Sequence, residues 1–246
     1  MKKLIDFLSR HPYLWMFLGA LLILIIKFPH FWTGSDPLAG YDTVGHYEAF
    51  LKQISLFREA RIKGYDLSWF GGMPVFYFYS PLFFWLGALI AVIVPVLAPA
   101  VIFKLLILAC LAALPPAFYY FAKTFLPQEP NPWIAFTLSL LYIFFQPHEF
   151  GELGIGLSGA VAAGLSNQAP GLILSLLFLS YYKRLIDGKD KFWHSPYFYL
   201  TVLAGTLLFY THILSTIFAA VLALFIFLSQ VKNKQTSVKS LIAFLS

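Results

Sequence analysis

The chain has 246 residues, of which 60% are hydrophobic and only 11% are charged. A typical soluble domain is about 45–50% apolar and about 25% charged, so the composition excludes an ordinary water-soluble domain and predicts an integral membrane protein. The formal net charge of +6 contains no basic block typical of nucleic-acid binding, and the single cysteine, Cys110, excludes an internal disulfide.

Apolar runs predict an all-α fold: a polytopic bundle of transmembrane helices that forms one domain over residues 1–246. They lie at 13–32, 78–98, 100–122, 131–147, 168–182, 193–210 and 213–230. No small-residue cleavage pattern follows the first run, so we expect an uncleaved anchor instead of a signal peptide.

Basic residues predict the orientation of these helices in the membrane. Lys2, Lys3 and Arg10 place the N-terminus in the cytoplasm, so the long polar stretch 33–77 lies outside. The next strong basic cluster is expected inside and consists of Lys183, Arg184, Lys189 and Lys191.

An odd number of crossings must therefore separate the outer loop from Lys183, although four apolar runs lie between them. The run 78–98 contains Pro81 and Pro95, and we expect it to form a re-entrant or interfacial hairpin that does not cross. The stretch 193–230 is too long for one span and predicts two, with a turn near Thr211 and His212.

Three polar sites then share the outer face: the loop 33–77, the stretch 148–167 and the turn at His212. A new apolar stretch begins at Leu241 near the end of the chain. We therefore expect the sequence to be the N-terminal part of a longer membrane protein, or a truncated membrane protein.

The outer loop contains the main candidate site. Asp42 and His46 are four residues apart and share one face of a helix. From Thr43 to Ile62, apolar residues recur at helical spacing and basic residues gather at the end, which predicts an amphipathic juxtamembrane helix. The following stretch, residues 69–81, combines two adjacent glycines with aromatic side chains suited to the headgroup level.

An outer first loop with an early Asp, an amphipathic helix, and then the motifs Gly-Gly-x-Pro and Tyr-x-Pro-Leu resembles the GT-C glycosyltransferases. The resemblance covers about Asp36 to Leu82 and is greatest to the membrane proteins labelled "6-pyruvoyl-tetrahydropterin synthase related". It implies an enzyme that moves a sugar from a polyprenyl-phosphate-linked donor to an acceptor glycan, lipid or protein on the outer face of the cell membrane.

The resemblance also implies that Asp42 is the catalytic carboxylate, either as a general base or as a ligand of Mg²⁺ or Mn²⁺. Thr43 and Val44 follow it in place of the adjacent acidic pair of other GT-C branches, so the sequence does not require a metal and we assign no metal site. His46 is expected to orient Asp42 or to bind phosphate. The structural alternatives are a helix N-cap for Asp42 and a loop histidine with no role for His46.

Further residues are candidates for substrate binding. They are Arg58, Arg61, His148, Glu149, Glu152 and His212. The two arginines either hold a carrier phosphate or contact lipid headgroups. The acidic stretch after the run 131–147 is a second polar site or a solvated loop, and His212 is a functional or a structural histidine beside an apolar run.

Two other function classes remain open. A lipid or glycan transporter, or flippase, would have proline-broken helices and charges at the membrane midplane, yet few charges lie inside the predicted spans. A non-catalytic scaffold would use the folded outer loop to present a surface to partners.

Overall fold

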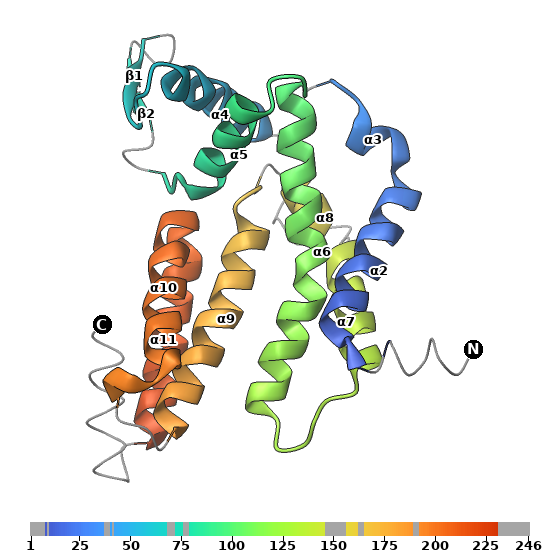
Figure 1. Ribbon diagram of the computed structural model, residues 1–246, viewed down its shortest axis with the longest axis vertical. Helices are drawn as coiled ribbons and strands as arrows, with labels where there is room; N and C mark the ends of the chain where they lie inside the picture. Colours follow the sequence, from blue (N-terminus) through green and yellow to red (C-terminus); the bar gives the residue numbers. More distant parts are fainter. Residues whose placement is uncertain are drawn as a thin grey trace.

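The computed structural model is mostly helical and describes residues 8, 10–36, 40, 42–67, 72–75, 79–145, 156–161, 165–188 and 192–230. Long helices run roughly along one axis, and a smaller layer lies across one end of them (Figure 1). Apart from one two-stranded hairpin in the described part, the helical content confirms the predicted all-α class.

The long helices follow the apolar runs. They are α2 (Pro12–Lys27), α6 (Pro99–Phe125), α7 (Pro132–Phe144), α9 (Gln168–Asp187), α10 (Pro196–Thr211) and α11 (Ile213–Gln230). Four of them begin with a proline, at a position where the missing N–H has no helical partner to lose. Asn131 also caps α7, because its side chain accepts a hydrogen bond from the Trp133 N–H.

Helix α6 occupies the middle of the bundle and packs against α2, α7 and α9. It has 27 residues and continues through Pro115 and Pro116, while α9 has 20. In the described part of the chain, these two helices are long and apolar enough to cross a membrane by length and composition.

The layer at one end, here called the cap, consists of α4 (Thr43–Arg58), β1 (Gly64–Asp66), β2 (Met73–Val75) and α5 (Leu82–Ile93). Helix α4 is the amphipathic helix predicted from the sequence. The antiparallel hairpin pairs Tyr65 with Pro74 and was not predicted, because three-residue strands are too short to show a periodicity of two.

The region 78–98 contains one short helix, α5, in place of the expected hairpin. Its 12 residues are about 18 Å long, which is well short of a bilayer core of about 30 Å. It lies beside α4 at the cap end, and α6 begins at that same end (Figure 1). The first apolar run also divides, because α2 ends before Pro29 and a separate α3 (Pro29–Thr33) follows.

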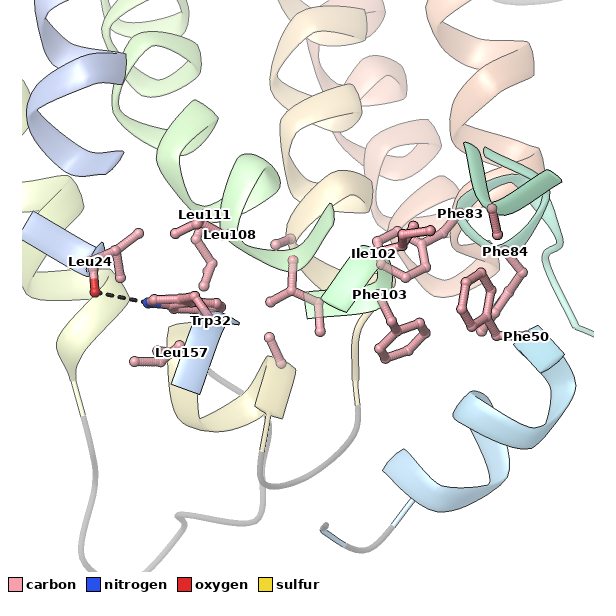
Figure 2. Packing of buried hydrophobic residues seen from close by; sticks show 14 of the residues in the cluster. Leu24, Trp32, Phe50, Phe83, Phe84, Ile102, Phe103, Leu108, Leu111 and Leu157 are labelled. Carbon is pink, nitrogen blue, oxygen red and sulfur yellow. Dashed lines mark hydrogen bonds between the residues drawn. The ribbon is translucent and has the colours of Figure 1, made fainter. Parts of the chain in front are cut away.

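A buried aromatic cluster joins the cap to α6 (Figure 2). The ring of Phe103 on α6 lies 5.3 Å from that of Phe50 on α4 and 5.6 Å from that of Phe83 on α5. Trp32 on α3 is also buried, and its Nε1 donates a 2.9 Å hydrogen bond to the carbonyl of Leu24. These contacts fix α4, and therefore the residues at its start, against the end of the bundle.

The remaining connections place the polar sites. Helix α8 (Gly156–Val161) precedes α9, and the short 3-10 helix η1 (Phe192–His194) precedes α10. The connection 126–131 and helix η1 lie at the end of the bundle opposite the cap, whereas the α10–α11 turn lies beneath the cap (Figure 1). This turn occurs at His212, as the sequence predicts.

Candidate functional site between the cap and the bundle

Ser80 connects the cap to the helices below it. Its Oγ donates a hydrogen bond of 3.3 Å to the carbonyl of Phe209 near the end of α10. Its own carbonyl accepts a 3.3 Å hydrogen bond from Nδ2 of Asn167, which immediately precedes α9. The segment that enters α5 is therefore held over the ends of two bundle helices.

A cavity of about 350 Å³ lies at this junction. Its walls come from the Tyr79–Pro81 segment, the first turn of α5, the α10–α11 turn and the residue before β1. The lining residues are Lys63, Tyr79, Ser80, Pro81, Trp85, Phe209, Tyr210, His212, Ile213 and Leu214. Ligand sites are commonly mostly apolar with a few convergent polar groups, and this lining has that character.

Two aromatic rings form one side of the cavity. Trp85 and Tyr210 are stacked, with ring centroids 6.2 Å apart. The Nε1 of Trp85 is buried and has no hydrogen-bond partner among the described residues.

His212 has a defined tautomer. Its Nδ1 accepts a hydrogen bond of 3.3 Å from the backbone N–H of Ser215 and lies 2.7 Å from the Oγ of the same residue. An N–H can only donate, so in the neutral ring the proton lies on Nε2. Burial lowers the pKa of His212, which favours this neutral form.

Asp42 and His46 lie at the start of α4, one turn apart. The backbone N–H of His46 donates a 3.0 Å hydrogen bond to the carbonyl of Asp42. Asp42 occupies the N-cap position, but its side chain makes no capping hydrogen bond. Asp42 therefore does not stabilise the helix by a capping hydrogen bond, which was the structural alternative to a catalytic role. Its carboxylate is exposed and available for other chemistry.

Tyr79 links this pair to the cavity. Its ring lies 4.9 Å from the His46 ring, and Tyr79 also lines the cavity that contains His212. Burial and, to a smaller extent, the nearby negative charge of Asp42 together raise the pKa of Tyr79 to about 12. Tyr79 therefore stays protonated at physiological pH and is a hydrogen-bond donor beside the carboxylate.

The predicted arginines are not part of this arrangement. Arg58 and Arg61 are exposed, and Arg61 forms a 3.3 Å salt bridge with Glu59. Neither arginine lines the cavity, whereas Lys63 does. The basic side chain that lines the cavity is therefore Lys63, which follows the two predicted arginines in the chain.

The second predicted acidic site, His148, Glu149 and Glu152, lies outside the described residues. The segment that follows it does return to the start of α4. Thr43, which is buried beside Asp42, donates a 2.9 Å hydrogen bond from Oγ1 to the carbonyl of Val161 at the end of α8.

In the ranges that the structure describes, no three His, Cys, Asp or Glu side chains gather closely enough to hold a metal ion. Asp42 and His46 alone would supply one oxygen and one nitrogen donor group. A divalent metal at this site would therefore need further ligands from substrate phosphate or from water.

No protein-family model matches the chain, and no curated protein or solved structure is significantly similar to it. The site must therefore be interpreted from its own geometry.

Sequence reasoning did not identify Tyr79, Trp85 and Tyr210 as site residues. Tyr79 belongs to the aromatic stretch 69–81, which we assigned to the headgroup level, whereas Trp85 and Tyr210 lie inside apolar runs that gave no signal of a site. Segments far apart in the chain contribute these rings, so only the folded arrangement shows that they line one cavity.

Proposed function

We propose that the chain is a multi-pass membrane glycosyltransferase of GT-C type. It transfers a sugar from a polyprenyl-phosphate-linked donor to an acceptor at the outer face of the membrane. The observation that carries the proposal is the placement of Asp42 and His46 beside Tyr79, which lines a cavity between the cap and the bundle.

Exposed apolar side chains support the membrane half of the proposal. On α11, Phe218 is 68% exposed and Phe225 is 64% exposed, and Ile26 at the end of α2 is 69% exposed. Helices α5, α7 and α10 also carry exposed large apolar residues. Apolar faces on this scale are unusual on soluble monomers and suit contact with lipid.

Charge placement supports the orientation. Lys123 and Glu129 pair at the end opposite the cap, as do Lys183 and Asp187. This end also holds the start of α2, so Arg10 and Lys183 belong to one side, taken as cytoplasmic. The cap and its cavity then face outward.

The chemistry assigned to the site is a single displacement. The acceptor hydroxyl attacks the anomeric carbon while the bond from that carbon to the phosphate oxygen breaks, and the phosphate leaves with the electron pair. Asp42 takes the hydroxyl proton as general base, and Tyr79 and His46 hold the carboxylate and the incoming groups in place. The apolar and aromatic cavity wall suits the lipid chain next to the carrier phosphate.

Replacing the carboxylate tests the proposal. Asp42→Asn keeps the shape of the side chain but cannot accept the proton, so we expect transfer to fall by about 10²- to 10⁴-fold. The measurement uses membranes that contain the full chain, a panel of radiolabelled polyprenyl-phosphate hexoses, and extraction of the glycosylated product.

Glu48→Gln is the matched control, because Glu48 is an exposed carboxylate on the same helix. Its transfer rate should stay close to that of the unmodified chain. An Asp42→Asn protein that is expressed normally and still forms product at the original rate would contradict the assigned role, and would favour a scaffold or another carboxylate.

A further inference from the structure

An arginine surrounded by tyrosines lies at the end of the bundle opposite the cap. Arg184 is in the last turn of α9, and its guanidinium carbon lies 4.9 Å from the ring centroid of Tyr120 on α6. The same atom lies 5.7 Å from the ring centroid of Tyr197 on α10. Its Nη1 donates a 3.2 Å hydrogen bond to the Tyr197 hydroxyl, and its Nε donates a longer one of 3.4 Å to Oγ1 of Thr124.

Further tyrosines extend this group. The ring of Tyr181 lies 5.8 Å from that of Tyr120 and 6.5 Å from that of Tyr197. The ring centroid of Tyr13, at the start of α2, lies 6.3 Å from that of Tyr120. Four helices therefore contribute to one aromatic, hydroxyl-rich surface around a single guanidinium.

The charge of Arg184 is compensated differently from that of its neighbours. Lys123 pairs with Glu129, and Lys183 pairs with Asp187. Arg184 contacts aromatic rings and hydroxyl oxygens but no carboxylate within the described ranges. A guanidinium has five N–H donors and is not deprotonated in proteins, so this site has donors and positive charge to offer an anion.

We propose that Arg184 and Tyr197 bind a phosphate group, and that the usual source of this phosphate is an anionic lipid headgroup. The Nη2 amino group has no acceptor among the described residues, and the Tyr197 hydroxyl accepts from Arg184 while keeping its own hydrogen to donate. Arg184 is half-buried, which leaves one side of it accessible. The surrounding tyrosine rings suit the interface where such headgroups lie.

This inference uses the membrane-spanning arrangement proposed above but is independent of glycosyl transfer. The test is lipid binding to the full chain in neutral detergent, measured by native mass spectrometry with added phosphatidylglycerol or phosphatidylcholine. We expect phosphatidylglycerol to be retained preferentially, and Arg184→Gln to weaken that retention by about tenfold or more, because a charge-assisted pair is lost.

Two further variants separate this site from general charge and from misfolding. Lys183→Gln removes the adjacent cation, which already has a carboxylate partner, and should retain phosphatidylglycerol as the unmodified chain does. Tyr197→Phe keeps the ring and the fold but removes the hydroxyl, and should bind with intermediate affinity. Equal retention by the Arg184→Gln protein and the unmodified chain, or equal loss in Lys183→Gln, would overturn the proposal.

The source of the phosphate is tested with inorganic phosphate alone. If inorganic phosphate raises the unfolding temperature of the unmodified chain but not that of Arg184→Gln, while phosphatidylglycerol has no effect, the site binds a soluble phosphate. The Asp42→Asn protein should bind phosphatidylglycerol normally, so failure of the transferase proposal and failure of this one give different results.

Discussion

At the residue scale, single side chains connect segments of the chain that are far apart in the sequence. Tyr79 contacts His46 at the start of α4 and lines the same cavity as His212, although neither residue is near it in sequence. His212 lines this cavity, and in its neutral ring the proton lies on Nε2. The polar chemistry therefore depends on a few residues whose surroundings are otherwise apolar.

His212 should make stability depend on pH. Burial lowers its pKa in the folded chain, so between the folded and unfolded pKa values the unfolded chain binds more protons. The free energy of unfolding should therefore fall as the pH drops below about 6.5, the usual value for histidine. Unfolding temperatures measured in detergent from pH 7.5 to pH 5 would record this loss.

The matched variants identify the group responsible. His212→Gln should flatten the acid branch of the stability curve, whereas His194→Gln, at an exposed histidine before α10, should leave it unchanged. A curve in His212→Gln that falls as steeply as in the unmodified chain would assign the pH dependence to another group.

At the element scale, the site depends on close packing between α9 and the α10–α11 turn. A Cβ atom added at Gly171 would lie 2.8 Å from the Cβ of His212 and 3.0 Å from Oγ of Ser215. The first of these atoms is fixed to the backbone and cannot move aside without shifting the turn. The small residue on α9 therefore allows the turn that carries His212 to sit where it does.

Gly171→Ala should destabilise the chain by about 1–3 kcal/mol, because overpacking displaces the turn. Thermal unfolding in detergent would measure the loss, and the pH dependence from His212 should change with it. Gly205→Ala is the control, since its added Cβ would lie 3.3 Å from the edge of the Phe178 ring. An unfolding temperature for Gly171→Ala equal to that of Gly205→Ala would contradict this account of the packing.

At the scale of the whole molecule, the two ends of the helix bundle differ in chemistry. The cap, the cavity and the α10–α11 turn lie at one end, and the ion pairs formed by Lys123 and Lys183 lie at the other. In the membrane arrangement that we propose, these ends face opposite sides of the bilayer. Helix α5 is part of the cap and does not cross the bilayer.

Cysteine labelling tests this orientation. In a Cys110→Ser background, Glu48→Cys in the cap should react with a membrane-impermeant maleimide in intact cells. Asp187→Cys, at the end of α9, should react only after permeabilisation, because both replaced residues are exposed but lie at opposite ends of the bundle. External labelling at position 187 would refute the proposed orientation.

Much of the helical framework could be predicted from the sequence. The run 213–230 became α11 with the same bounds, and 100–122 and 168–182 correspond to α6 and α9. The turn at His212 and the helix after Asp42 were also predicted correctly. Long apolar runs and helical periodicity are local properties, so they can be recognised without knowledge of the fold.

The composition and these local patterns by themselves determined the helical class and the positions of most of the long helices, whereas Asp42 became a candidate only through the resemblance of the outer loop to a known family. Only the tertiary structure decided that Lys63 and not Arg61 lines the cavity, and that Tyr79, Trp85 and His212 line it too. The reason is physical: a cavity exists where distant segments meet, and their meeting depends on core contacts such as Phe50 with Phe103. Such contacts leave no periodic signal in the sequence.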